Sequence, residues 1–96
     1  MIFDVIFPTN YFSIRMQHYE NITTTILSTA IDRGAEKSTC PSEIARMLFP
    51  DDWRKHMKDV LEVAIDLHNK GSVVITQKGV PVDVKDFKGP VRIKII

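Results

Sequence analysis

Cysteine, long apolar runs and an excess of one charge are what this sequence has least of. Its 96 residues include one cysteine, Cys40, which excludes an internal disulfide and is typical of a reducing cytoplasm. No run of about 18 apolar residues occurs, so no membrane-spanning helix is expected. The first residues, MIFDVIF, lack the basic leader and cleavage site of a signal peptide. The sequence therefore predicts a cytoplasmic protein that does not associate with a membrane.

The numbers of basic and acidic side chains in the sequence are nearly equal. Thirteen Lys and Arg side chains against 12 Asp and Glu give a formal net charge of +1. Nucleic-acid-binding domains usually carry a clear basic excess, so this balance counts mildly against that class. It does not exclude the class, because basic side chains can still gather on one face of the folded chain.

Residue patterns for catalysis and metal binding are absent as well. The chain has no Ser-His-Asp pattern and no glycine-rich phosphate loop. His18, His56 and His68 lack the spacing of metal ligands, and His68 fits better as a hydrogen-bonded core residue. Cys40 at a helix start could be reactive, but without a resolving cysteine it is better explained as a small apolar residue in a tight turn. We therefore expect no enzyme, no metal site and no cofactor.

What the sequence does contain is three stretches of helical spacing. We predict helices over residues 20–33, before Gly34; over 41–49, with Pro41 in the first turn; and over 53–70, after a cap at Asp51 or Asp52. Residues 36–39 form a connector that can hold a very short strand. The positions expected to face the core are Ile22, Ile26, Leu27, Ala30, Ile31, Ile44, Ala45, Met47, Leu48, Trp53, Met57, Val60, Leu61, Ala64, Leu67 and His68.

After Gly71 the period changes to two, which predicts strands. Residues 73–76 are β-branched throughout, and residues 91–95 alternate apolar with basic side chains. The long polar segment between them predicts one hairpin with an extended tip. Its second strand would direct Arg92 and Lys94 into solvent, free to contact a partner.

Residues 1–19 are predicted to be an extended N-terminal arm. Apolar side chains precede a turn at Pro8-Thr9-Asn10, and residues 11–18 alternate as in a short strand. These apolar side chains need a cover, so the arm either packs on the domain or meets a second copy. A homodimer through the arm is one expectation that follows.

Residues 20–96 then form one mostly helical α+β domain. The order helix, connector, helix, helix, strand, strand is that of a winged helix, in which a C-terminal β-hairpin wing packs beside a three-helix helix-turn-helix unit. The stretches PSEIARML, DDWRKHM, GSVVITQKG and KGPVRIK, in that order, resemble a family of small uncharacterised bacterial proteins, a domain of unknown function. The resemblance covers Ile22 to Ile96. It implies a winged-helix-like fold and neither an established activity nor a catalytic residue.

The leading functional hypothesis is binding of double-stranded DNA through the third helix and the wing. In a winged helix these two elements meet the grooves and the phosphates, and cations there neutralise backbone charge. The residues predicted to contact phosphate are Arg54, Lys55, Lys58, Lys78, Lys88, Arg92 and Lys94.

Two observations favour a plainer interpretation of these cations as solvated surface charges. Asp59, Glu62 and Asp66 continue along the exposed face of the third helix and would repel DNA. That face also lacks the Asn, Gln and Ser side chains that read base edges well. Trp53 could stack on a nucleic-acid base, but its spacing fits a core anchor better. The alternative function is therefore a protein-interaction or dimerisation module, with the apolar arm around residues 3–12 as its contact surface.

Overall fold

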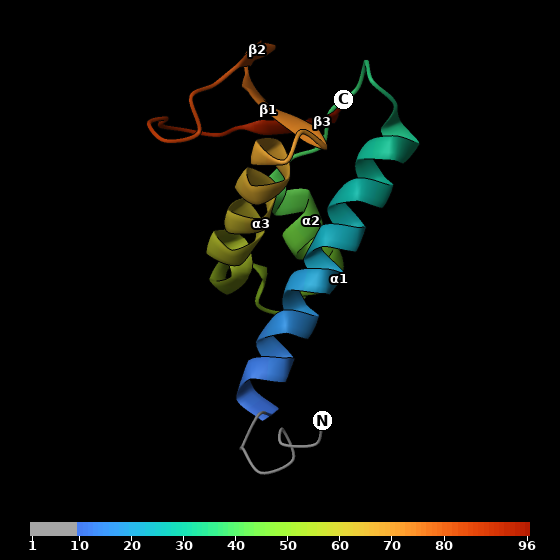
Figure 1. Ribbon diagram of the computed structural model, residues 1–96, viewed down its shortest axis with the longest axis vertical. Helices are drawn as coiled ribbons and strands as arrows, with labels where there is room; N and C mark the ends of the chain where they lie inside the picture. The colour runs from blue at the N-terminus through green and yellow to red at the C-terminus, as the bar shows by residue number, and fades with distance from the viewer. Residues whose placement is uncertain (1–9) are drawn as a thin grey trace.

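The computed structural model describes the backbone of residues 10–96 and the side chains of residues 19–96. Within this part of the chain, three helices are followed by a small three-stranded antiparallel sheet (Figure 1). The elements are α1 (Asn10–Arg33), α2 (Pro41–Leu48), the 3₁₀ turn η2 (Trp53–His56), α3 (Met57–Asn69), β1 (Val73–Gln77), β2 (Val80–Pro81) and β3 (Arg92–Ile95). The predicted class, a mostly helical α+β fold compatible with a winged helix, is confirmed.

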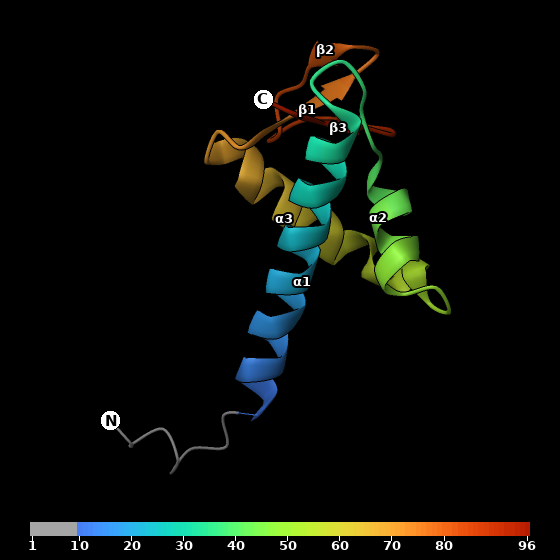
Figure 2. The same ribbon diagram turned by 90° about the vertical axis from the view of Figure 1, so that its right-hand side faces the viewer.

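Helix α1 is longer than predicted. It begins at Asn10 rather than near Glu20, so the strand predicted over residues 11–18 is wrong. Once a helix is nucleated, each further residue adds one backbone hydrogen bond at low cost, and this outweighs a short period-two pattern. The N-terminal half of α1 projects away from α2 and α3 (Figures 1 and 2). Residues 1–9 of the predicted arm lie outside the described residues.

The helix and sheet boundaries follow from local signals in the sequence. Gly34 and Gly71 end α1 and α3 with left-handed φ angles of 83° and 84°. Pro41 opens α2, where its missing N–H would have no helical partner. Asp52 precedes η2 but makes no capping bond, and its carboxylate lies 3.4 Å from Nε2 of His56 instead. The third helix is thus a 3₁₀ turn followed by an α-helix, not one continuous helix.

The core lies where the three helices meet the inner face of the sheet. Its fully buried large side chains are Ile22, Ile26, Ile44, Val60, Val63, Val73, Ile75 and Ile93. Two predicted core residues are exposed instead: Ile31 to 63% and Met47 to 50%. Ile31 lies half a turn around α1 from Ile22, beyond the stripe that the other elements cover. Val63 was not predicted but is buried, because it lies on the same helical stripe as Val60, Ala64 and Leu67.

The two predicted strands pair antiparallel, as expected, but a short third strand lies between them in the sequence and adds to the sheet. β1 is the central strand, with β2 on one edge and β3 on the other. Lys78 and Gly79 join β1 to β2 in a two-residue turn, both with positive φ, as a tight hairpin turn of the primed type requires. β2 ends at Pro81, and the next residue still donates a backbone hydrogen bond in the same register, from the Val82 N–H to the Ile75 carbonyl oxygen at 3.0 Å. The hairpin is therefore formed by β1 and β2, and the chain then crosses to the far edge of β1 to become β3.

Residues 82–91 form this crossing segment, whose charged side chains are exposed while its apolar side chains face the domain. Val82, Val84 and Phe87 pack against the core. Nε2 of Gln77 donates hydrogen bonds to the carbonyl oxygens of Lys88 and Pro90, at 2.6 and 3.0 Å. The segment is thus held against the hairpin end of β1.

The connector between α1 and α2 contains the very short strand that the sequence allowed. Thr39 exchanges two backbone hydrogen bonds with Ile93, of 2.8 and 2.7 Å. This bridge attaches the start of α2 to the outer edge of β3. Among the described residues, no helix is both long enough and apolar enough to cross a membrane.

Candidate nucleic-acid interface

The basic residues predicted for the third helix lie at its start. Arg54 and Lys55 belong to η2, Lys58 is in the first turn of α3, and all three are exposed. Beyond this turn the exposed side of α3 is acidic. Asp66 pairs with Lys70 at 3.0 Å, and Glu62 accepts a 2.5 Å hydrogen bond from the hydroxyl of Tyr19. Only the N-terminal end of α3 therefore presents uncompensated cations.

Three more of the predicted residues lie at the hairpin end of the sheet. Lys78 forms the turn after β1, and Arg92 is paired with Thr76, the last residue but one of β1. The carbonyl of Lys88 is bound by Gln77 at the same end. The strand register and the Gln77 side chain bring the backbone positions of these three cations to one end of the sheet.

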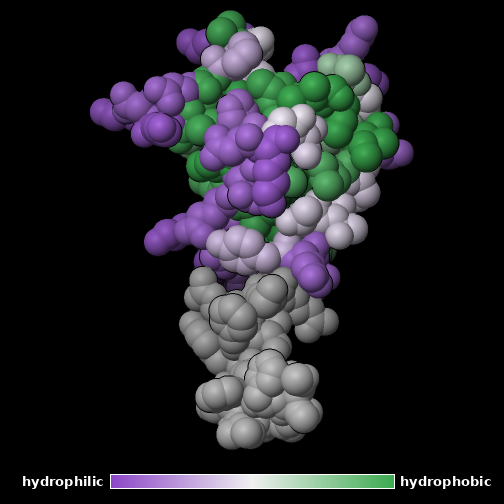
Figure 3. All heavy atoms as spheres, in the orientation of Figure 1, coloured by the Kyte–Doolittle hydropathy of each residue, from purple (hydrophilic) through white to green (hydrophobic). Residues whose placement is uncertain are grey.

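The crossing segment also meets the start of α3. A half-enclosed apolar pocket of about 170 Å³ is lined by the residues Cys40, Pro41, Ser42, Met57, Leu61, Phe87, Gly89, Pro90 and Val91. Lys58 follows the lining residue Met57 in the sequence, and Lys88 follows the lining residue Phe87. On the face shown in Figure 3, hydrophilic side chains project where this segment and the start of α3 lie in Figure 1, with apolar surface between them. The segments that contain Lys58 and Lys88 therefore border the same pocket.

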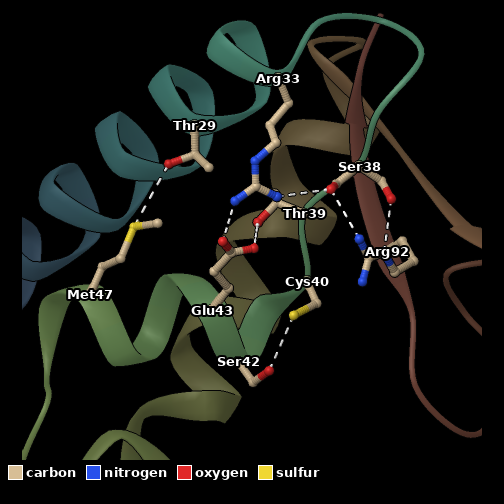
Figure 4. A network of polar contacts seen from close by, with 9 residues as sticks. All are labelled: Thr29, Arg33, Ser38, Thr39, Cys40, Ser42, Glu43, Met47 and Arg92. Carbon is tan, nitrogen blue, oxygen red and sulfur yellow. Dashed lines mark hydrogen bonds and ion pairs between the residues drawn. The ribbon is translucent and has the colours of Figure 1, made fainter.

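Arg92 is not free as predicted. Its Nε donates to the hydroxyl of Ser38 at 2.8 Å, and its Nη2 donates to the carbonyl of Ser38 at 3.0 Å (Figure 4). The sequence could not indicate this bond, because Ser38 and Arg92 are 54 positions apart. Lys94, two residues further along β3, is half-buried and paired with Val74. Of the two, Arg92 already holds β3 to the connector.

A second arginine meets Ser38 from α1. Nη1 of Arg33 donates to the Ser38 carbonyl at 3.0 Å, while its Nη2 binds the carboxylate of Glu43 in α2 (Figure 4). The hydroxyl of Thr39 donates to the other Glu43 oxygen at 2.6 Å. The hydrogen bond from Arg33, and next that from Thr39, lower the pKa of Glu43 from 4.5 to about 2. This network joins α1, the connector, α2 and β3.

Trp53 packs against the core, as predicted, but it is only half-buried. Two guanidinium groups lie over its ring: the Cζ atoms of Arg46 and Arg54 are 4.3 and 4.6 Å from the ring centroid. Arg46 comes from the last turn of α2 and was not among the predicted residues. It precedes Trp53 by seven positions across a turn, so no helical spacing could have indicated the contact.

The remaining polar residues singled out in the sequence have structural partners. His68 accepts a 3.3 Å hydrogen bond from the Ile75 backbone N–H, which confirms it as a hydrogen-bonded residue beside the core. Sγ of Cys40 lies 3.2 Å from the Ser42 hydroxyl. His56 stacks on Phe49 with ring centroids 3.7 Å apart. Among the side chains that the structure describes, no group of three or more His, Cys, Asp or Glu could hold a metal ion.

The arm proposed as a dimer contact is not assessed by this geometry, because its residues 1–9 lie outside the described part of the chain. A homodimer through the arm stays a prediction.

The fold defines a class: a small, mostly helical α+β domain, compatible with a winged helix. Residues 19–96 match a protein family described as a protein of unknown function (DUF3253), and the chain belongs to this family. The resemblance expected from the four sequence stretches is thus confirmed, over a range that begins three residues earlier. No curated protein matches the chain.

Proposed function

We propose that this protein binds duplex DNA as a winged-helix domain, through η2, the first turn of α3 and the hairpin end of the sheet. The observation that carries the proposal is that residues 87 and 89–91 line one pocket with Met57 and Leu61 of α3, so the segment that contains Lys88 lies beside the turn that contains Lys58. Cations gathered on one side of a fold can neutralise several phosphates at once, even where the net charge is near zero. The protein is then a binding protein rather than an enzyme.

Phosphate contact is the favoured mode of binding. The exposed positions of α3 beyond its first turn carry Glu62 and Asp66, which cannot pair with the guanine acceptors that Arg and Lys contact. In helix-turn-helix proteins the N-terminal residues of the recognition helix approach the DNA. Lys58 occupies that position, and its neighbours in η2 extend the same end. We therefore expect weak sequence preference and strong salt dependence.

The test is binding to a labelled mixed-sequence duplex, followed by fluorescence anisotropy at several salt concentrations. We expect the double change Arg54→Glu and Lys58→Glu to abolish measurable binding at about 100 mM salt. We expect Lys88→Gln to lower the slope of log K against log salt by about one unit.

Lys70→Glu is the matched control for the charge reversals. Lys70 follows the C-terminal end of α3, about 18 Å of helix from Lys58, and it should bind DNA like the wild type. Absence of binding by the wild type at low ionic strength would overturn the proposed function. Equal weakening by Lys70→Glu would show that only the overall charge matters and would overturn the assigned surface.

A further inference from the structure

We infer that Arg46 and Arg54, held over the ring of Trp53, act as a paired contact to neighbouring phosphates of the DNA. This inference rests on the proposed function and adds Arg46 to the binding surface. It also gives Trp53 a role as a positioning residue. Neither assignment was available from the sequence, where Trp53 is explained as a core anchor alone.

The geometry of the pair comes from two different elements. Arg46 projects from the last turn of α2, and Arg54 from η2, and both are exposed. With the Cζ atoms 4.3 and 4.6 Å from the same centroid, the two guanidinium groups lie within about 9 Å of each other. Phosphates follow each other at about 3.4 Å of axial rise along one strand. Two cations this close can therefore contact neighbouring phosphates of one backbone.

Trp53 makes this pair more effective than two isolated surface arginines. A free arginine side chain loses rotamer freedom when it binds, and that loss weakens association. The attraction between a guanidinium group and the indole ring restricts both side chains before DNA arrives. Packing of Trp53 against the core fixes the ring itself. Because each guanidinium presents several N–H donors, the edges that do not face the ring stay available for phosphate oxygens.

The acidic groups near the pair limit binding without removing the site. Asp51 and Asp52 precede Trp53, and Asp59 lies in the first turn of α3. The carboxylates of Asp52 and Asp59 lie beside the His56 ring, at 3.4 and 3.8 Å from its nitrogens. Lys55 and Lys58 add to the two arginines, so the cations in this region outnumber the three carboxylates. The contact is therefore expected to be short-range and sensitive to salt.

The experiment uses the fact that Trp53 is the only tryptophan of the chain, so its emission reports on this site directly. The full-length protein is titrated with a mixed-sequence duplex while tryptophan emission and the anisotropy of the labelled DNA are recorded. We expect the emission to change with the same midpoint as the anisotropy. Arg46→Gln and Arg54→Gln should each weaken binding about five- to tenfold and lower the salt slope by about one unit.

Substitution of the ring separates positioning from direct contact. Trp53→Leu should weaken binding about threefold and leave the salt slope unchanged, because the cations remain but are less ordered. Trp53→Phe keeps a ring for the arginines and should recover most of the affinity. Circular dichroism of each variant confirms that it is folded, and Lys70→Gln serves as the matched loss of one distant cation.

The possible results distinguish this inference from the function on which it rests. If the wild type binds DNA but Arg46→Gln and Arg54→Gln bind equally well, the paired contact is wrong and the proposed function stands. If the protein prefers single strands, and only the Trp53 variants lose affinity, the ring stacks on bases and the phosphate pair is overturned. If the wild type binds no DNA at low salt, both proposals fail.

Discussion

Glu43 is the residue at which the most separate parts of the chain meet. Its carboxylate accepts hydrogen bonds from Arg33 of α1 and from Thr39 of the connector, which itself bridges to β3. An acidic side chain in the first turn of a helix is expected from the helix dipole alone. The Glu43 carboxylate also accepts hydrogen bonds from two side chains, because the connector turns back over the start of α2. The residue thus serves the tertiary structure more than the helix in which it lies.

Changing Glu43→Gln should destabilise the fold by about 1–2 kcal/mol at pH 7, a value reduced for partial solvent exposure. The folded-state pKa of about 2 lies below the unfolded value near 4.5, so the ionised carboxylate stabilises the fold above about pH 4.5. This contribution is lost as the pH falls towards 2. Urea unfolding across that range should therefore show the wild type and the variant converging in acid. An equal loss of stability in acid by the wild type and the variant would contradict this role of the Glu43 carboxylate.

At the scale of elements, the segment between β2 and β3 decides what the sheet can present. It is held by the Gln77 side chain, and Gly89 lies beneath that side chain with φ of 89°. A Cβ at position 89 would lie 3.6 Å from Nε2 of Gln77, so there is space for a side chain. The left-handed φ angle, however, is one that residues with a Cβ rarely adopt. The segment is thus fixed by one amide side chain and one left-handed residue.

Replacing Gln77→Ala should free residues 88–90, since both carbonyl oxygens lose their donor. We expect a loss of about 1 kcal/mol in the free energy of unfolding and faster amide exchange over residues 85–91. Hydrogen exchange read by mass spectrometry measures the second effect. Gln77→Met, which keeps the length of the side chain but has no donor, should behave like the alanine variant. Wild-type exchange in the methionine variant would mean that packing, not hydrogen bonding, holds the segment.

For the whole molecule, one core serves both the helices and the sheet. Ile93 is fully buried, pairs with Ile75 in the sheet and bridges to Thr39 of the connector. The same core supports the ring of Trp53 on one side and Phe87 of the crossing segment on another. The basic surface therefore depends on the packing of the entire domain.

Ile93→Ala should lower the free energy of unfolding by about 3 kcal/mol, as expected for a fully buried isoleucine. Equilibrium urea unfolding measures the loss, with an unchanged m-value if the denatured state is unaffected. Ile96→Ala is the matched control, because Ile96 is 71% exposed and its loss should cost less than about 0.5 kcal/mol. A similar loss at both positions would contradict the placement of the core.

Much of the fold could be predicted because the relevant signals are local. Pro41, Gly34 and Gly71 set helix ends through their own backbone preferences, and the β-branched run after Gly71 marks β1. The predictions of secondary structure were wrong where a local sequence pattern was ambiguous. The alternation of residues 11–18 fits a strand as well as the start of a long helix. The polar segment after residue 76 was interpreted as one long hairpin tip, although Lys78 and Gly79 close a hairpin by themselves.

The candidate site was predictable only in part. Lys58 and Lys88 are predicted as cations of the third helix and the wing, but nothing in the sequence shows that the segments containing them line one pocket. Arg92 was expected in solvent and is bonded to Ser38, and Arg46 was overlooked although it lies over Trp53. Each of these contacts joins residues that are not separated by a helical or strand repeat, so the sequence pattern could not predict it.

The amino-acid sequence determined the kind of elements, their approximate ends and the family, because backbone preference and amphipathic period act over a few neighbouring residues. Only the tertiary structure decided the order of the strands, the path of residues 82–91 and the partners of Arg33, Arg46 and Arg92. Those features depend on distances between side chains that are remote along the chain. Such distances are set by how one shared core is packed, and no local pattern records them.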